Sequence, residues 1–336
     1  ADRVVWLHNG AHHITFDHCD ILGNATSTSS LTGVIVGSST STSISSSGDN
    51  ASDITVTNCK ISGGYYGFSI YGGGTTSFTS NYVLTDNEFV DQYYYPIRLY
   101  YCDSLFVERN MVPGVRNTFG YGMYIYYTSN AYIRQNQVYV PTYGMYLYRP
   151  NHNDATAHSE VSNNFFGSSG SYGTYTYQPT NVMIHHNSFR GNSYGLYLLG
   201  TTGLDSTDVR NNIFVSNTTY ALYIGTTPTN FTLDYNLYHT VSGSSIAYQG
   251  GAHATLSAWQ TAQSSYNTNS LQGDPGFVSS TDFHILGTLP NDAGLNGLST
   301  VDVDGDVRPA SGSTSVDIGA DEFTPLNWDA SLEAIM

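Results

Sequence analysis

The segment "YRPNHNDATAH" holds the densest set of groups in this chain that could carry acid–base chemistry. It places Arg149, His152, Asp154 and His158 in one loop. A cation, two imidazoles and a carboxylate can move protons to or from a substrate if they meet in a pocket. We therefore take Arg149, His152 and Asp154 as candidate catalytic residues, with a solvated polar loop as the alternative.

Two further clusters have the composition of metal sites. "DVDGD" spaces Asp302, Asp304 and Asp306 as in a Ca²⁺-binding loop, although the later Glu of an EF-hand is missing. These three form a candidate Ca²⁺ site, with a plain acidic turn as the alternative. In "HITFDHCDI", strand alternation sends neighbouring His and Asp side chains to opposite faces, which favours a solvated edge over a metal site. No other cofactor is expected.

The composition limits what such groups could act on. The chain has 336 residues, 11% of them charged, and 10 Lys+Arg against 26 Asp+Glu give a formal net charge of −16. Phosphate binding needs clustered cations, so no nucleic acid partner is expected. No apolar run reaches the roughly 18 residues of a membrane-spanning helix, so no membrane insertion is expected. The three cysteines fit no metal or redox spacing.

The elements that must position these residues follow from a repeat. A pattern of apolar, any, any, Asn or Cys, any, apolar recurs nine times, from "FDHCDI" to "LDYNLY". Its fourth residue is Cys19, Cys59, Asn87, Asn110, Asn136, Asn164, Asn187, Asn212 and Asn236. After a first step of 40, the steps are 23–28 residues, which is typical of a solenoid.

Between successive Asn positions lies one tyrosine-glycine phrase, such as "YGMYIYY" or "YGMYLYRP", whose apolar residues alternate with the period of a strand. Helical phasing is absent, and Gly, Asn, Asp, Ser and Pro separate the strands. We predict an all-β chain, a parallel β-helix of about nine to ten coils over residues 1–250. Residues 251–323 are expected to form an irregular C-terminal cap with a short helix in "LSAWQTA", and 324–336 a linker or tail stub.

On these motifs the chain resembles the right-handed parallel β-helix proteins of the pectate-lyase-like superfamily, across roughly residues 1–250. The resemblance implies that the repeated Asn and Cys residues stack inward as a ladder from coil to coil. It leaves the activity open, because this fold hosts lyases, hydrolases, adhesins and structural proteins. The order "LSAWQTA", "GDPGFVSSTDFHILG", "VDVDGDVRPASGSTSVDIGADEF" is similar to the closing segment of secreted bacterial "choice-of-anchor" β-helix proteins, which implies export to an extracellular or cell-surface location.

The tyrosine-glycine strands predict columns of outward side chains about 4.8 Å apart along the solenoid. One column is expected to run from Ile35 through Arg98, Tyr124, Tyr146, Tyr175, Tyr197 and Tyr223 to Ala247, and the next through Tyr71, Tyr100, Tyr126, Tyr148 and Tyr177. A third, from Tyr66 to Tyr220, lies near a corner. Stable strands alone would explain a single ladder, but neighbouring ladders form a patch broad enough to bind a partner. Sugar rings and another copy of the chain are the two candidate guests.

Two functions remain open at this stage. The favoured one is an exported structural or adhesive module that uses the tyrosine ladders, and that could stack head-to-tail into filaments because no capping helix precedes "VVWLHN". The alternative is a polysaccharide lyase or hydrolase. The resemblance implies an Arg or Lys base for a lyase, for which Arg98 is a candidate, while a hydrolase needs paired carboxylates. Glu108 with Arg134, and Arg210 with Asp234, are expected to be surface pairs between coils.

Overall fold

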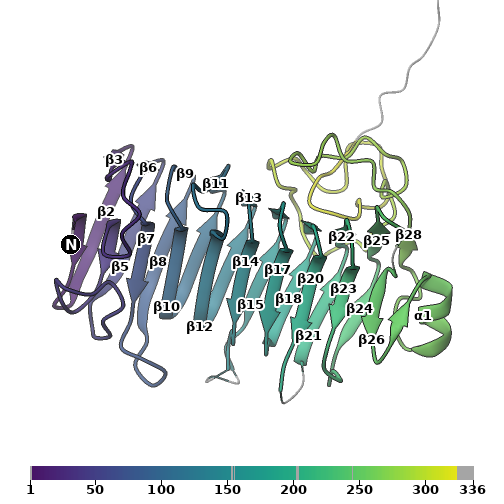
Figure 1. Ribbon diagram of the computed structural model, residues 1–336. Helices are drawn as coiled ribbons and strands as arrows, with labels where there is room; N and C mark the ends of the chain where they lie inside the picture. Colours follow the sequence, from purple (N-terminus) through teal and green to yellow (C-terminus); the bar gives the residue numbers. More distant parts are fainter. Residues whose placement is uncertain (1, 153, 155, 202–203, 244, 324–336) are drawn as a thin grey trace, which may run out of the picture.

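The computed structural model describes residues 2–152, 154, 156–201, 204–243 and 245–323, so the predicted stub 324–336 lies outside the described residues. The chain winds into a right-handed parallel β-solenoid of about nine coils (Figure 1), which confirms the predicted fold class. Each coil contributes strands to three faces, and nearly every strand pairs in parallel with the equivalent strand one coil away. Short strands joined by polar turns, repeated at a near-constant step, produce this form because each coil buries its apolar face on the next.

The first face carries the tyrosine-glycine phrases. Its strands are β1 (Arg3–Leu7), β4 (Gly33–Gly37), β7 (Tyr66–Tyr71), the first halves of β10 (Tyr95–Glu108) and β12 (Tyr121–Arg134), β14 (Tyr143–Tyr148), β17 (Tyr172–Tyr177), β20 (Tyr194–Leu199), β23 (Tyr220–Ile224) and β26 (Ala247–Gln249). The short strand β27 (Ala252–His253) returns antiparallel to β26.

The second face follows directly along the chain, and in β10 and β12 the strand continues round the corner unbroken. Its strands are β2 (Ala11–Asp17), β5 (Ala51–Thr57), β8 (Thr79–Thr85), the second halves of β10 and β12, β15 (Ser159–Ser162), β18 (Thr180–His185), β21 (Asp205–Arg210) and β24 (Thr232–Asp234).

The third face consists of short strands that follow the repeated Asn and Cys positions. They are β3 (Asp20–Leu22), β6 (Lys60–Ser62), β9 (Glu88–Val90), β11 (Met111–Val112), β13 (Gln137–Val140), β16 (Phe165–Ser168), β19 (Ser188–Gly191), β22 (Ile213–Ser216), β25 (Leu237–Thr240) and β28 (Leu271–Gln272).

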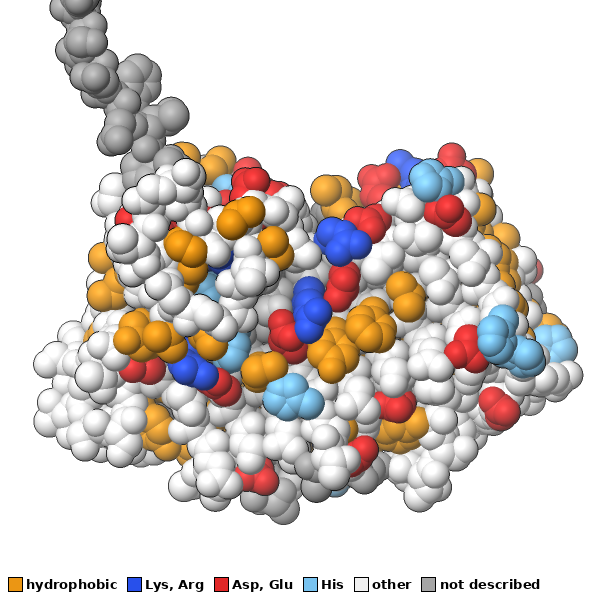
Figure 2. All heavy atoms as spheres, turned by 180° about the vertical axis from the view of Figure 1, so that it is seen from behind, with side chains coloured by type: hydrophobic (Ala, Val, Ile, Leu, Met, Phe, Trp, Pro, Cys, Tyr) orange, Lys and Arg blue, Asp and Glu red, His pale blue; other side chains and the backbone are white. Residues whose placement is uncertain are grey.

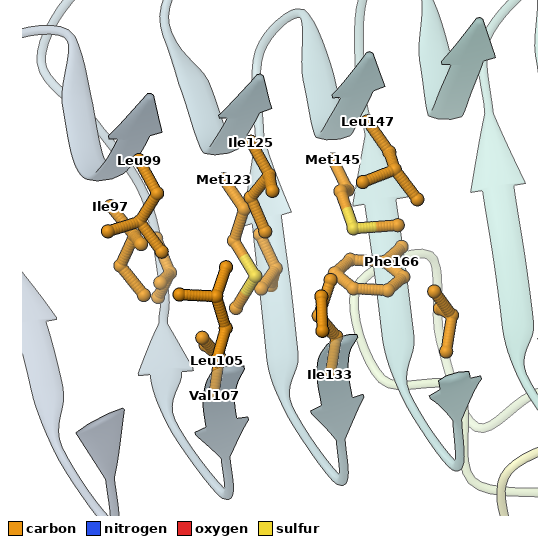
Figure 3. Packing of buried hydrophobic residues seen from close by; sticks show 14 of the residues in the cluster. Ile97, Leu99, Leu105, Val107, Met123, Ile125, Ile133, Met145, Leu147 and Phe166 are labelled. Carbon is orange, nitrogen blue, oxygen red and sulfur yellow. The ribbon is translucent and has the colours of Figure 1, made fainter. Parts of the chain in front are cut away.

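The interior is filled by alternate side chains of all three faces. Ile97, Leu99, Met123 and Ile125 point inward from the first face and meet Val107 from the second (Figure 3), and all are fully buried. Burying each such side chain stabilises the fold by about 1.5–3 kcal/mol. The core therefore runs the whole length of the solenoid.

Two further segments cover parts of the solenoid. Helix α1 (Leu256–Ala262) lies beyond β26 (Figure 1) and inserts the fully buried Trp259 against Tyr238 of the last coil. Residues 273–323, the C-terminal segment, pack on the outside of the third face, where Phe283 meets Phe165. The segment is held together by a fully buried ion pair between Arg308 and Glu322, whose Nη1 and Oε2 atoms are 2.8 Å apart.

The turn between the second and third faces requires a left-handed backbone at one residue per coil. The φ angle is positive at the residue just before each repeated Asn or Cys, namely at His18, Asn58, Asp86, Arg109, Gln135, Asn163, His186, Asn211 and Tyr235. The left-handed residue thus lies one position before the repeated Asn or Cys. Only some of these residues are Asn or Asp, which tolerate the conformation best, so packing of the coils holds the turn.

Candidate functional site

The repeated asparagines form one buried column along the corner before the third face. Asn136 shows the arrangement: its Oδ1 accepts from the backbone N (3.0 Å) and Nδ2 (3.0 Å) of Asn110, while its Nδ2 donates to Oδ1 of Asn164 (2.9 Å) and to the carbonyl of Val107 (2.7 Å). The same bonds link Asn87, Asn110, Asn136, Asn164, Asn187, Asn212 and Asn236, all at most 2% exposed. The polar atoms of this column are hydrogen-bonded within the protein, so the column stabilises the fold and offers no donor or acceptor to a ligand.

The column ends in other residue types. Near the N-terminus, Cys59 N donates to Asn87 Oδ1 (3.0 Å) and Cys19 N donates to Cys59 Sγ (3.4 Å), and both cysteines are free thiols. Burial raises the pKa of the Cys59 thiol. At the other end Asn236 N donates to Ser270 Oγ (3.0 Å). Ser270 lies outside the repeat pattern, 34 residues after Asn236, so the sequence carries no signal for its role.

The tyrosine columns of the first face lie in strict register. The first column contains Tyr124, Tyr146, Tyr175, Tyr197, Tyr223 and Tyr248; the second Tyr71, Tyr100, Tyr126, Tyr148 and Tyr177; the third Tyr66, Tyr95, Tyr121, Tyr143, Tyr172, Tyr194 and Tyr220. We call these three columns together the tyrosine surface. Most of the rings are half-buried against one another, and the C-terminal segment packs on a different face.

Both ends of the first column differ from the sequence prediction by one residue. Val36, not Ile35, aligns with Ser69, and Tyr248, not Ala247, aligns with Tyr223. The run Val34 to Val36 is buried throughout, because Ile44 of the following loop packs on the outer side of Val36. Such a run has no alternation from which the register could be inferred.

The rings form a herringbone pattern. Within the first column Tyr146 and Tyr175 are parallel, with centroids 5.0 Å apart and planes 8° apart, and Tyr197 and Tyr223 are 4.3 Å and 1° apart. Rings of the third column meet those of the first nearly at right angles, as for Tyr143 and Tyr146 at 89°. Offset stacks and T-shaped contacts are the two favoured aromatic geometries. Each ring face is thus used by a neighbouring ring, and solvent meets ring edges and hydroxyl groups.

Crowding changes the acidity of these phenols. Desolvation by the neighbouring rings raises the pKa of Tyr126 and of Tyr172 to about 12, and it raises the pKa of Tyr124 and Tyr146 still further. These four phenols are therefore uncharged at neutral pH and remain so above pH 10. They offer hydroxyl donors and acceptors to a guest and carry no charge.

Arg98, the candidate lyase base, is inside the protein and not on its surface. It is 5% exposed, and the loop after β4 covers it. Its Nε donates to Ser69 Oγ (3.0 Å), Nη1 donates to Ser45 Oγ (3.1 Å), and the guanidinium lies 4.4 Å from the ring centroid of Tyr66. A cation held in this way fastens the loop to the tyrosine surface and cannot reach a substrate proton. Arg98 is therefore a cation stacked on tyrosine rings.

The loop after β14 does not assemble its candidate catalytic residues. Arg149 donates through Nη1 to the hydroxyl of Tyr127 and lies over the rings of Tyr127, Tyr148 and Tyr177. His152 is exposed beside Tyr127, and the exposed Asp154 accepts from the backbone N (2.8 Å) and Oγ1 (2.7 Å) of Thr156. Among the described residues no ion pair joins Asp154 to Arg149 or His152. Arg149 thus makes a cation–π contact, His152 makes an edge contact with a ring, and Asp154 closes a turn.

The three aspartates of "DVDGD" do not converge either. Asp302 is fully buried, and its Oδ1 accepts from the backbone N of Asp304 (2.9 Å) and of Asp306 (2.8 Å), while its Oδ2 accepts from Glu322 N (3.0 Å). Asp302 thus closes the turn around its own carboxylate. Asp304 turns toward His284, and Asp306 is exposed. The acidic turn, and not a Ca²⁺ loop of these three carboxylates, is the arrangement found.

Charged side chains of the second face pair across coils. Arg134 lies between Glu108 (3.6 Å) and Glu160 (2.5 Å), and Figure 2 shows such Arg side chains alternating with Asp and Glu along the face turned to the viewer. Arg210 and Asp234 are neighbours in register on β21 and β24, as predicted, but the ion pair that Arg210 forms is with Asp208 in its own strand. Arg210 binds Asp208 because the two side chains point to the same side of β21.

One hollow lies between the C-terminal segment and the third face. It encloses about 550 Å³ and is lined mainly by apolar residues of β11, β13 and β16, together with Asp282 and His284. A smaller cleft of about 330 Å³ lies beside Glu108, Arg134 and Glu160. The sequence analysis found neither, because both are formed by the C-terminal segment folding back over distant coils.

The geometry defines a class of protein: a right-handed parallel β-solenoid with an aromatic outer face. A family model described as a right-handed β-helix region matches residues 4–159 and 114–261, and the chain belongs to this family. Searches of curated proteins and of solved structures found no match. In the part of the chain that the structure describes, no helix has the length and apolar character needed to span a bilayer.

Proposed function

We propose that this β-helix is an exported adhesive surface protein that holds an extended polysaccharide along its tyrosine surface. The observation that carries the proposal is the register of the tyrosine columns, of which the first and third repeat without interruption from β12 to β23 on a face that the C-terminal segment leaves open. Strand stability alone would accept Thr or Val at these positions. A face of uniform side chains over several coils suits a guest that is itself a repeating polymer.

The herringbone pattern determines how such a polymer would be held. Because the faces of Tyr146 and Tyr175 are stacked on each other, a sugar ring would meet hydroxyl groups and ring edges, not open ring faces. A phenol hydroxyl both donates and accepts a hydrogen bond, and sugar hydroxyls do the same. Each contact would be weak, but contacts repeated along one chain add up, as in multivalent binding.

Adhesion is favoured over the lyase or hydrolase alternative by the placement of the charged groups. Arg98 is enclosed beneath a loop, and Arg149 is engaged by Tyr127. The carboxylates Glu108 and Glu160 lie on the second face and are shared by Arg134.

Self-assembly is the second candidate function, and only as lateral contact between two tyrosine surfaces. Helix α1 covers the last coil with Trp259, which counts against head-to-tail stacking at that end. Lateral contact between two tyrosine surfaces would use the same hydroxyl groups as a polysaccharide would. The net charge of −16 opposes such pairing of two copies at low ionic strength, so we place the polysaccharide first.

The test removes rings from the tyrosine surface while keeping the strands. The variant Tyr146→Thr with Tyr175→Thr removes a stacked pair from the first column, and the matched control Phe106→Thr with Tyr132→Thr removes a stacked pair (5.1 Å, 13°) from the second face. Binding to a panel of purified polysaccharides is measured by affinity electrophoresis, and self-association by sedimentation velocity. We expect the first variant alone to lose binding.

A third variant, Tyr146→Phe with Tyr175→Phe, keeps the rings and removes only the hydroxyl groups. Loss of binding in this variant would support the hydrogen-bonding mode. If the wild-type chain binds none of the polysaccharides and the first variant instead loses self-association, the tyrosine surface is a contact between copies. If a folded first variant keeps both properties, the tyrosine surface has no binding role.

A further inference from the structure

His284 occupies an unusual position in the C-terminal segment, because both of its ring nitrogens meet carboxylates. Nδ1 is hydrogen-bonded to Oδ1 of Asp282, two residues earlier, and Nε2 lies 2.8 Å from Oδ2 of Asp304. The imidazole also packs edge-on against the ring of Phe165, with centroids 4.9 Å apart. The ring is therefore fixed in orientation from three sides.

A third carboxylate completes the cluster. One ligand atom each from His284, Asp304 and Asp321 lies within 4.8 Å of the others. Asp321 is buried and is held by the backbone N of Ile285, which donates to its Oδ2 over 2.7 Å. The three residues come from separate parts of the segment, so the fold brings them together and their sequence spacing does not.

The geometry points to a binding site for a divalent transition-metal ion at His284, Asp304 and Asp321. In metal sites a ligating His usually gives its other ring N–H to a carboxylate, which fixes the tautomer and raises the basicity of the ligand. Asp282 stands at Nδ1 in that position, and Nε2 faces the two carboxylates. An imidazole with two carboxylates suits Zn²⁺ or Mn²⁺, whereas Ca²⁺ and Mg²⁺ prefer oxygen ligands alone.

The site is open on one side. Asp304 is exposed and His284 is partly exposed, so water or a small anion could take the remaining coordination positions of a bound ion. Three protein ligands with free positions are typical of exchangeable metal sites, and four of closed structural ones. A bound ion would also join the turn at Asp304 to the strand-like stretch at Ile285 and to the chain at Asp321.

The test is isothermal titration calorimetry with ZnCl₂ on chain that has been treated with a chelator and dialysed. The decisive pair of variants is Asp304→Asn and Asp306→Asn, since both remove one carboxylate from the same turn and only Asp304 contacts His284. We expect Asp304→Asn, Asp321→Asn and His284→Gln to lose the site, and Asp306→Asn to retain it. Asp282→Asn should weaken Zn²⁺ binding by about 10–100-fold, the usual effect of losing such an outer partner.

The comparison of variants also separates this site from Zn²⁺ held by the free thiols Cys19 and Cys59, because that binding would persist in Asp304→Asn. Thermal unfolding with and without ZnCl₂ provides a second measurement, since an ion that binds only the folded chain raises its midpoint. The inference is overturned if Asp304→Asn binds Zn²⁺ as tightly as Asp306→Asn does. It is equally overturned if CaCl₂ binds more tightly than ZnCl₂ in the same titrations.

Discussion

The asparagine column and the tyrosine surface are both made by repeating one residue type along the same solenoid, but they are held by different forces. In the column each buried amide satisfies a backbone carbonyl of the preceding coil and a side chain of the next. On the tyrosine surface each ring gains contact area from its neighbours, and all but the buried Tyr66 remain partly exposed. Removing an asparagine leaves buried donors without acceptors, whereas removing a tyrosine only loosens a stack.

This contrast separates a repeated residue that only stabilises the fold from a repeated residue that can also bind a partner. Polar atoms inside the column have no spare capacity, so substitution there should affect stability alone. The tyrosine surface keeps its polar atoms at the solvent side, so substitution there can change binding at a small cost in stability. The following four changes test that division, beginning with the largest expected effect.

Alkaline titration should dismantle the tyrosine surface. The phenols of Tyr126 and Tyr172 have a pKa raised from 10.0 to about 12 in the folded chain, so the unfolded chain loses these protons first as the pH rises. Stability should be unchanged below pH 10 and fall between pH 10 and 12. Tyrosinate absorbance and circular dichroism should change together. Ionisation of the whole set of 29 tyrosines near pH 10 with the fold intact would contradict the buried character of the columns.

Asn164→Leu should be the most damaging single substitution. It removes the acceptor of the backbone N and Nδ2 of Asn136 (both 2.9 Å) and the donor to the carbonyl of Ile133 (2.8 Å). We expect the free energy of unfolding to fall by about 3–5 kcal/mol, measured by urea denaturation. Asn192→Leu, at a surface position outside the column, serves as the control and should change it by no more than about 0.5 kcal/mol. Equal effects at both positions would refute the role of the column.

Ser270→Ala tests the end of the column, where only one coil depends on the side chain. Ser270 Oγ accepts from the backbone N of Asn236 over 3.0 Å. Losing one buried acceptor should lower the free energy of unfolding by about 1–2 kcal/mol. Hydrogen exchange at the Asn236 amide should accelerate more than exchange at Asn136. Uniform acceleration along the column would show that its bonds break as one unit.

Tyr197→Thr should have the smallest effect on stability. The substitution removes stacking on Tyr175 (5.0 Å) and Tyr223 (4.3 Å) but keeps a residue that favours strands. A loss of about 1 kcal/mol or less is expected from the thermal midpoint. A loss as large as that of Asn164→Leu would mean that the tyrosine surface is as structural as the asparagine column.

The middle of the solenoid could be predicted from sequence because its signals repeat. Asn136 and its equivalents make the same contacts in every coil. The alternation of residue types around Tyr146 shows which side chains point inward and which point outward, without knowledge of the rest of the fold. The predicted register was wrong at Val36 and at Tyr248, where a loop or the last coil interrupts the repeat. Repetition supplies information only where the neighbours of a residue are also repeated.

Residues outside the repeat could not be placed for the same reason. Arg98 occupies an outward position on its strand, but the loop carrying Ser45 covers it. Neither the sequence of the strand nor that of the loop contains a pattern that predicts this contact. His284 meets Asp304 and Asp321 because the C-terminal segment folds on itself, with separations along the chain that match no known motif. Such sites depend on how irregular segments pack, and local pattern does not encode it.

The hydrogen bonds between the side-chain amides of the asparagine column all run in one direction. From Asn87 to Asn212, each Nδ2 donates to the Oδ1 of the next Asn toward the C-terminus. The side-chain dipoles therefore add instead of cancelling, as peptide dipoles add along an α-helix. Bonds in such a chain polarise one another, so a bond with neighbours on both sides is stronger than one at an end. The centre of the solenoid is thus reinforced by its own length, and loss of structure should start at the two terminal coils and move inward.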